Sequence, residues 1–408
     1  MKKKILLLLI ILINSCTSEN IANIEYSDLK LYKEVELEEN EDVILNNITS
    51  VVFNSDCSKF IVSSYLNYDK VIIYDTNGKI IKFFEPSVYF CDSISTKRQY
   101  WKGSIVILKS SDLVNSEGKS PTIDEISKDL IHSYGKGIFL NDSIIFIIGN
   151  IKAYANDLRN GIKKCIDSLN GCSNTSLIII NMHNDEQMVN PFEKNTIVAT
   201  PYSALYNSTD SILYCSCMSE QYSSICAYHL NGEFIKVVSN LPDEYISSGI
   251  KYSITCDPEI IFDTNKNLIA TYPYVEKIYN ITEGSIFKLQ NLPNYNSSFL
   301  EKLAEEQKKY KSEYYFQNFL NKVQSLYLTF DGNYFVSIRC EDTIEYNKNS
   351  CHILQVYKPN GELLKQAKIP LFDNDVINQF VAYSKKDDLI LSFHISKTTG
   401  WKIKFWKW

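Results

Sequence analysis

A short phrase that occurs three times constrains the fold of this chain more than any other feature of its sequence. The copies are "IYDTNGKIIKFF" from residue 73, "AYHLNGEFIKVV" from residue 227 and "QVYKPNGELLKQ" from residue 355. In each copy a Tyr precedes an Asn-Gly pair by three residues, and a short apolar run follows (Tyr74, Tyr228 and Tyr357). Asn-Gly between alternating apolar residues predicts a β-hairpin, and here a type I′ turn, because that turn needs positive φ at both central positions. Three copies of one hairpin predict a fold built from internal repeats.

Alignment on this phrase divides the chain into six units of four short strands. The first strands end in the polar turns of "VVFNSD", "GIFLND", "ALYNSTD", "IIFDTNKN", "YLTFDGN" and "VAYSKKDD". Five units end with a fourth strand, but the sixth stops at Trp408 without one. Residues 29–37, "LKLYKEVEL", alternate apolar and charged side chains, which predicts an outer strand that completes the last unit. Such pairing closes a ring and removes an exposed sheet edge.

This layout resembles six-bladed β-propellers of the NHL and related type, and in particular the six-bladed propeller lipoproteins of Bacteroidota. The resemblance covers about residues 29–408 and is carried by the repeated "Y-x-x-N-G-x-φ-φ-K" hairpins, where φ stands for an apolar residue. It implies an all-β, six-bladed β-propeller closed by the N-terminal strand. A seven-bladed ring, in which residues 86–134 form a blade, is the alternative. The units lack the regular aspartates and arginine of the NHL repeat, so the resemblance implies no functional residue.

The N-terminus has the features of an export signal. "MKKK" is followed by the apolar "ILLLLIILI", and Ser15 stands directly before Cys16. About nine apolar residues are too few to span a bilayer, which takes roughly 20. "INSC" resembles a bacterial lipobox, which implies that residues 1–15 are removed and that Cys16 is acylated; ordinary secretion is the alternative. Residues 16–28 then form a tether, and Thr17, which is not an aspartate, points to the outer membrane by the enterobacterial sorting rule. Exposure on the periplasmic or the surface side stays open.

Ten cysteines remain besides Cys16, an even number that suits an oxidising compartment. Six of them stand at the two ends of short loops, and each pair is predicted to form a disulfide: Cys165 with Cys172, Cys217 with Cys226, and Cys340 with Cys351. Cys215 competes for Cys226, and the sequence does not pair Cys57, Cys91, Cys215 and Cys256. The chain has neither paired CxxC spacing nor a His cluster of metal-ligand spacing, so we expect no metal and no other cofactor.

Two insertions interrupt the repeat, at about residues 86–134 and 293–323. The second is predicted to be helical, because Phe299, Leu303 and Tyr310 share one helical face, and Leu320 and Val323 continue the pattern. Both insertions join a fourth strand to the next first strand, so in a propeller they emerge on the same face as the loops between second and third strands. We call this face the decorated face, and the opposite one, which keeps only tight turns, the tight-turn face.

The decorated face is where we expect binding, because loops held by a rigid scaffold usually carry function. Amphipathic rings suit contacts that are part apolar and part wet, and the candidate binding residues are Tyr100, Trp101, Tyr314 and Tyr315. For most aromatics of the second insertion, packing onto the propeller is the expected role.

The composition and the motifs restrict the class of function. The net charge is −6 and no basic patch occurs, which argues against nucleic acid as a partner. The five histidines are scattered, and no G-x-S-x-G, H-E-x-x-H or phosphate-binding loop is present. We therefore expect a monomeric, non-catalytic binding or scaffold module for an envelope protein, peptide or glycan. The alternative is an envelope hydrolase or lyase, for instance one with two separated carboxylates. Three or more converging ionisable side chains at the channel mouth of the decorated face would favour the enzyme.

Overall fold

The computed structural model describes sixteen stretches of the chain. They are residues 24–45, 48–64, 70–84, 99–102, 131–157, 162–166, 175–193, 197–219, 222–250, 257–294, 296, 299–310, 319–342, 350–373, 376–396 and 400–408. Residues 1–15, Cys16, Tyr314 and Tyr315 lie outside these described residues. No helix within the described part is long and apolar enough to cross a membrane.

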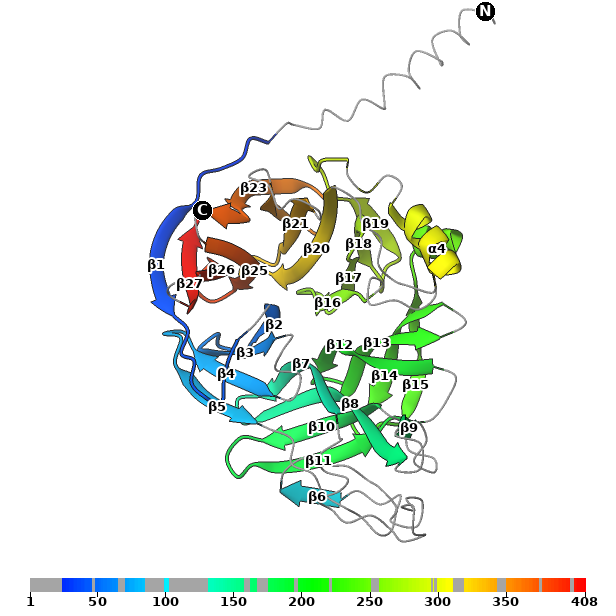
Figure 1. Ribbon diagram of the computed structural model, residues 1–408. Coiled ribbons are helices and arrows are strands. Elements are labelled where there is room, and N and C mark those ends of the chain that lie inside the picture. The colour runs from blue at the N-terminus through cyan, green and yellow to red at the C-terminus, as the bar shows by residue number, and fades with distance from the viewer. Residues whose placement is uncertain are drawn as a thin grey trace, which may run out of the picture.

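Six antiparallel sheets form a ring, and each sheet is one blade of a propeller (Figure 1). Blade 1 holds β2 (Ile48–Phe53), β3 (Lys59–Ser64), β4 (Val71–Asp75) and β5 (Ile80–Phe84). Blade 2 holds β7 (Ile131–Asn141), β8 (Ile144–Asp157), β10 (Thr175–Asn181) and β11 (Glu186–Pro191). Blade 3 holds β12 (Ile197–Asn207), β13 (Ile212–Ser219), β14 (Ser223–His229) and β15 (Phe234–Asn240). In every blade the first strand lies nearest the centre of the ring.

The second half of the ring repeats the pattern. Blade 4 holds β16 (Glu259–Phe262), β17 (Leu268–Tyr272), β18 (Val275–Asn280) and β19 (Ser285–Lys288). Blade 5 holds β20 (Phe319–Leu328), β21 (Tyr334–Asp342), β22 (Cys351–Tyr357) and β23 (Leu363–Pro370). Blade 6 holds β25 (Val376–Ser384), β26 (Leu389–Ser396), β27 (Gly400–Lys407) and β1 (Lys30–Glu36), with the two-residue β24 (Phe372–Asp373) beside β25.

The N-terminal strand closes the ring, as the sequence predicts. β1 pairs antiparallel with β27, from Lys30 opposite Lys407 to Glu36 opposite Lys402. The core beneath this seam joins both ends of the chain, because Leu37, Val43 and Leu45 pack in one cluster with Phe393 and Trp401. The indole N–H of Trp401 donates to the carbonyl of Leu45 at 3.0 Å. Residues 24–28 also contact the ring, since the amide of Ser27 donates to the carbonyl of Gln366 in β23 at 2.8 Å.

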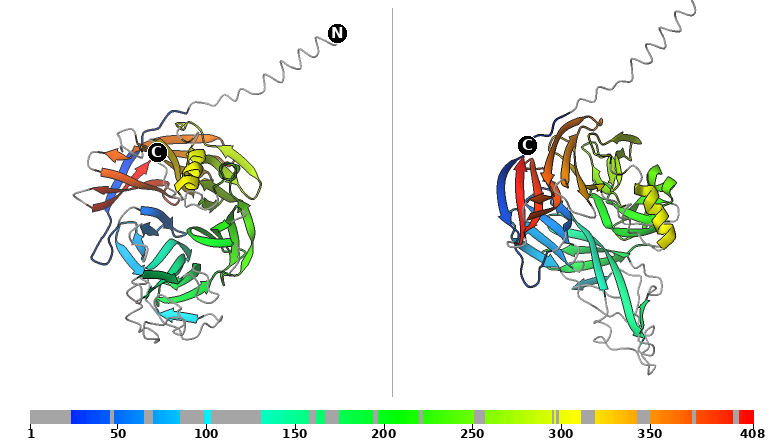
Figure 2. Two further views of the ribbon diagram at one scale, coloured as in Figure 1. Left: turned by 45° about the vertical axis from the view of Figure 1, so that its right-hand side comes forward. Right: turned by 45° about the horizontal axis from the view of Figure 1, so that its top comes forward.

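The ring has six blades, and the first insertion does not add a seventh. Its described strand, β6 (Gln99–Lys102), pairs with β11 and extends the outer edge of blade 2. β8 is extended beyond the blade, and its outer part pairs with β9 (Ile162–Ile166), so that this hairpin projects from the ring (Figure 2).

The Asn-Gly turns differ from the type I′ turn that the sequence predicts. Gly78, Gly232 and Gly361 have φ of +77°, +88° and +88°, but the asparagines before them do not have positive φ. In the first copy the amide of Gly78 donates to the carbonyl of Asp75 at 3.1 Å, and the amide of Asp75 donates to the carbonyl of Lys79 at 2.9 Å. This is a type I turn followed by a left-handed glycine, the G1 bulge. One residue with positive φ is enough, and glycine supplies it.

The repeated phrase also joins neighbouring blades. Glu38, which follows the outer strand of blade 6, donates its amide to the carbonyl of Gly78 at 2.8 Å and accepts from the amide of Ile80 at 3.1 Å. The hydroxyl of Tyr74 donates to the carbonyl of Glu38 at 3.0 Å. We call this set of contacts the inter-blade clasp.

The clasp recurs between other blades. Glu193, which follows the outer strand of blade 2, donates to the carbonyl of Gly232 at 2.9 Å and accepts from the amide of Phe234 at 2.9 Å. Between blades 4 and 5, the amide of Gln290 donates to the hydroxyl of Tyr357 at 2.7 Å. The glycine carbonyl of each copy, and the tyrosine hydroxyl of the first and third copies, therefore bond to the neighbouring blade, whereas the hydroxyl of Tyr228 has no partner in the described part of the chain. Reading the phrase as a turn alone misses this role.

The second insertion packs on the decorated face. α4 (Phe299–Tyr310) lies beside α3 (Asp243–Ser248), and the buried Phe299 and Leu303 share a core cluster with Tyr245 of α3 and Tyr272 of β17 (Figure 1). The expected packing role of the apolar stripe is confirmed for Phe299 and Leu303. The continuation of the helical pattern was wrong, because Leu320 and Val323 lie in β20 and face the core as strand residues.

Candidate functional site

A cavity of about 300 Å³ lies on the axis of the ring. Its walls come from the innermost strands of all six blades, β2, β7, β12, β16, β20 and β25. Apolar and aromatic side chains form much of the lining, among them Phe53, Phe139, Tyr206 and Phe380. In blades 1 to 5 the innermost strand is the free edge of its sheet, and in blade 6 β25 is paired in part with β24. Main-chain N–H and C=O groups of these edges face the cavity as well. The cavity is thus apolar in its side chains and polar along its strand edges.

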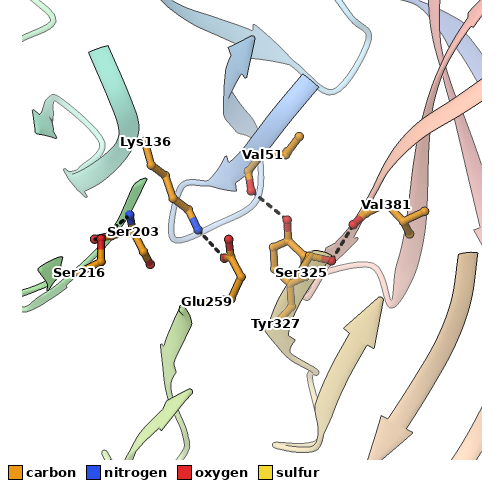
Figure 3. Close-up of polar contacts among 8 residues, drawn as sticks. All are labelled: Val51, Lys136, Ser203, Ser216, Glu259, Ser325, Tyr327 and Val381. Atoms are coloured by element: carbon orange, nitrogen blue, oxygen red, sulfur yellow. Dashed lines mark hydrogen bonds and ion pairs between the residues drawn. The ribbon is translucent and has the colours of Figure 1, made fainter. Parts of the chain in front are cut away.

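An ion pair crosses the channel between blades 2 and 4. The ammonium of Lys136 in β7 lies 2.6 Å from the carboxylate of Glu259, the first residue of β16 (Figure 3). Their side chains are 12% and 25% exposed. Lys136 stands where the pairing of β7 with β8 shifts register, between Tyr134 and Gly137. A bulge re-aims a side chain, which accounts for a lysine that points into the channel from the edge of a sheet.

A tyrosine crosses the channel on the opposite side. The hydroxyl of Tyr327 in β20 donates to the carbonyl of Val51 in β2 at 2.9 Å, and so links blade 5 to blade 1 past blade 6 (Figure 3). Burial, and then the charge of Glu259, raises the pKa of Tyr327 well above its usual value. The phenol therefore stays protonated and remains a donor. Next to it, the hydroxyl of Ser325 donates to the carbonyl of Val381 at 2.8 Å.

One hydroxyl of the lining has unused hydrogen-bonding capacity. Ser50 lines the cavity and is 7% exposed, and its Oγ has no hydrogen-bond partner among the described residues. Ser203, labelled in Figure 3, also has an Oγ without a partner in the described part of the chain. Both oxygens are buried beyond the reach of a water-sized molecule, so neither bonds to a ligand in the cavity without a local rearrangement.

Irregular pairing recurs at the inner strands. Register shifts occur in β2, β7, β12, β20 and β25 where each pairs with the second strand of its blade. Side chains bond to the main chain near two of these shifts, those in β20 and β25. Gln324 Nε2 donates to the carbonyl of Gln379 at 2.8 Å, and Arg339 donates to the same carbonyl at 3.1 Å. Sequence reasoning missed these bulges and the ion pair, because neither leaves a local signal in the sequence.

The four predicted binding residues are not brought together in the described structure. Tyr100 and Trp101 lie in β6, opposite Met188 and Gln187 of β11, on the outer edge of blade 2. Tyr314 and Tyr315 lie outside the described residues. The cavity is lined by inner strands, so Tyr100 and Trp101 belong to a different surface from the channel.

The described histidines do not converge. His183 and His229 are exposed near turns between third and fourth strands, whereas His352 and His394 are buried in β22 and β26. Burial, and next the charge of Arg339, lowers the pKa of His352 to about 3. No group of three or more His, Cys, Asp or Glu side chains suited to a metal ion occurs among the described residues.

The buried histidine makes stability depend on pH. Below about pH 6.5 the unfolded chain protonates His352 while the folded chain does not, so stability falls as pH falls from there toward pH 3. When the pH is lowered from about 7 to about 5, the free energy of unfolding of wild type should fall by about 2 kcal/mol more than that of His352→Gln. Urea unfolding at both pH values measures this difference. His183→Gln, at an exposed position, should keep the wild-type pH dependence. Equal pH dependence in all three proteins would contradict the prediction.

Two predicted disulfide pairs lie where a bond can form. Cys340 and Cys351 are directly opposite in the pairing of β21 with β22, and Cys217 Sγ lies 2.9 Å from Cys226 Sγ. Both are thiol contacts, since a disulfide bond measures about 2.05 Å. A hydrogen bond with Cys351 raises the pKa of Cys340 and lowers that of Cys351.

The other predicted pair is not described in full, because Cys172 lies outside the described residues; Cys165 belongs to β9. Cys215 faces Cys226 across β13 and β14, whereas the thiol contact is made by Cys217. The competition between Cys215 and Cys217 is thus visible in the structure and stays open.

Oxidation of the thiol pairs is a testable expectation. Non-reducing peptide mapping of protein from cell envelopes should recover a peptide that links Cys340 to Cys351. Loss of that bond in Cys351→Ser should lower the free energy of unfolding by about 3 kcal/mol, the closure entropy of a short loop. Cys57→Ser, at a turn, is the control. Free thiols at both positions in the isolated protein would show that the pair is not a disulfide.

The ring of six sheets around an axial cavity defines the chain as a six-bladed β-propeller. No model of a known protein family matches it, and no curated protein matches it. Solved structures that it is similar to include an exported protein of Bacteroides fragilis NCTC 9343, with 10% identity, a TM-score of 0.49, and coverage of 94% of this chain and 98% of that chain.

Two further similarities are weaker. The Dos1 propeller has 8% identity, a TM-score of 0.39, and coverage of 93% of this chain and 95% of that chain. The extracellular domain of a one-component system of B. thetaiotaomicron has 11% identity, a TM-score of 0.36, and coverage of 93% of this chain and 40% of that chain. None of these similarities carries information on function.

Proposed function

We propose that the protein is a lipid-anchored β-propeller of the bacterial cell envelope that binds a protein, peptide or glycan through its decorated face, without catalysis. The observation that carries the proposal is the difference between the two faces. Turns on the tight-turn face are short, as between β2 and β3 or between β22 and β23. The connections of the decorated face contain α3, α4 and the projecting hairpin of β8 and β9.

The decorated face is rigidly supported where its helices lie. Leu303 and Phe299 are 0% and 3% exposed, and the ring of Phe299 lies 4.4 Å from that of Tyr274, between their centroids. An ion pair joins Glu244 of α3 to Lys277 of β18. Helices held in this way present their outer side chains at fixed positions. Binding of a partner to them therefore costs little conformational entropy. The exposed Glu301 and Glu305 lie on the outer side of α4.

The channel supports binding over hydrolysis. Glycoside hydrolysis uses two carboxylates on either side of the scissile bond. Among the described residues that line the cavity, Glu259 is the only carboxylate, and Lys136 neutralises it. Lys136 and Glu259 pair there, Lys385 lies at the exposed turn between β25 and β26, and much of the remaining lining is apolar, aromatic or hydroxyl-bearing. This mixed lining is what we expect of a binding module.

Membrane anchoring through Cys16 remains part of the proposal. Several acyl chains on the cysteine would hold the protein stably, because each buried CH₂ contributes about 0.8 kcal/mol. Cys16→Ser should move the protein from the membrane fraction to the soluble fraction and abolish labelling by an acyl probe. Equal labelling of the variant would contradict the lipobox interpretation.

Photo-crosslinking in living cells tests the binding face. A photoreactive residue at Glu305 reports on the decorated face, and one at Glu362 reports on the tight-turn face; both side chains are exposed. We expect adducts with an envelope component from position 305 and none from position 362. Adducts from position 362 alone, or equal adducts from both, would contradict the proposed face.

A further inference from the structure

The polar groups of the axial cavity are balanced in charge. Lys136 brings three N–H donors and Glu259 brings several acceptor sites, and the ion pair uses only part of both. An anionic ligand would be attracted by Lys136 and repelled by Glu259. A cationic ligand would be attracted by Glu259 and repelled by Lys136. Charges this close act strongly in a partly enclosed site. The pair therefore favours a neutral ligand.

The cavity also has hydrogen-bonding groups that an apolar ligand would leave unsatisfied. The innermost strands of blades 1 to 5 are free edges of their sheets and face this space, so sheet pairing leaves main-chain N–H and C=O groups there, apart from those that bond to side chains, as Val51 does to Tyr327. Covering such groups with hydrocarbon would bury donors and acceptors without partners, at a cost in free energy. A hydroxyl group both donates and accepts, so it can bond to Lys136, to Glu259 and to the main-chain groups of the strand edges.

The volume of the cavity and the apolar part of its lining restrict the class of ligand further. A volume of about 300 Å³ is at the lower end of the range of small-molecule pockets, roughly 300–1,000 Å³. Aromatic residues, among them Tyr206, Phe53 and Phe139, form part of the lining, so the cavity also has apolar surface for the C–H groups of a ring. Lys385 lines the cavity and is exposed, so the cavity opens toward the tight-turn face at the turn between β25 and β26.

We propose that the axial cavity is a binding site for a neutral, hydroxyl-rich small molecule of about one sugar ring, held by Lys136, Glu259 and the main-chain groups of the inner strand edges. The site is separate from the decorated face, so it stands or falls independently of the partner proposed there. Binding in the channel would couple blades 2 and 4, which supply the two charged side chains, and would stabilise the ring against opening.

Calorimetric titration of the purified protein tests the site. The neutral probes are glucose, galactose, N-acetylglucosamine and myo-inositol, used one at a time; glucuronate and glucosamine are the charged comparators. We expect saturable binding of at least one neutral probe and weaker binding of both charged ones. Glu259→Gln and Lys136→Met should weaken that binding about tenfold or more, because each removes a charged hydrogen-bonding group from the cavity.

A matched control separates the channel from general effects of charge. Lys358 and Glu362 also form an ion pair, at 2.8 Å, but on a surface turn, where their side chains are 44% and 53% exposed. Glu362→Gln should bind the probe as wild type does. If Glu259→Gln fails to fold, as its melting curve would show, Lys136→Met carries the test. Absence of saturable binding for every neutral probe, preference for a charged one, or unchanged affinity in the channel variants would overturn the proposal.

Discussion

Deletion of residues 20–38 should lower the melting temperature on the order of 10 °C or more and cause aggregation. The deletion removes β1 and its pairing with β27, from Lys30 to Glu36. It leaves the edge of β27 open along its length, and an open, partly apolar edge is a template for pairing with other chains. It also removes Leu37, which is 5% exposed in the core beneath the seam, and Glu38 of the inter-blade clasp.

The control deletion must spare the contacts that residues 24–28 make. Ser27 bonds to β23, and the ring of Tyr26 lies 3.9 Å from the ammonium of Lys368. Deletion of residues 17–22 spares these contacts, so its melting curve should match that of wild type. Scanning calorimetry and light scattering measure both outcomes. A chain without residues 20–38 that melts as wild type does would mean that the ring does not depend on this seam.

The ring could be predicted from the sequence because its signals are local and repeated. Alternation of apolar residues marks each strand, and the Asn-Gly phrase fixes where third strands turn into fourth strands. The alternating "LKLYKEVEL" and a sixth unit that lacks its last strand were enough to place β1 beside β27. Errors arose where one pattern suits two structures. Leu320 and Val323 fit a helical period and nevertheless belong to the strand β20.

The channel could not be predicted, because its parts come from distant positions. Lys136 and Glu259 are 123 residues apart, and each by itself reads as an ordinary surface charge. The bulge that turns Lys136 inward depends on pairing between β7 and β8, which no single strand encodes. The four candidate binding residues of the decorated face were chosen by residue type alone. Tyr100 and Trp101 accordingly lie at an outer edge, away from the inner strands that line the cavity.

Gly78→Ala should be strongly destabilising because its position serves the clasp as well as the turn. At φ +77°, a Cβ costs about 1 kcal/mol by itself. Added at Gly78, it would also lie 2.1 Å from the carbonyl oxygen of Glu36, the last residue of β1. That atom belongs to the backbone, so the turn or the strand must shift, and the contacts of Glu38 with Gly78 and Ile80 weaken together. We expect a loss of about 3 kcal/mol or more in the free energy of unfolding.

Gly284 provides a matched control in the corresponding turn of blade 4. Its φ is +72°, and a Cβ there meets nothing within 4 Å. Gly284→Ala should therefore cost only the backbone strain, about 1 kcal/mol. Urea unfolding of both variants measures the difference, which is the contribution of the close approach between blades 6 and 1. If the two variants lose the same free energy, the glycine of the repeated phrase serves the turn alone, and the contact between blades does not require it.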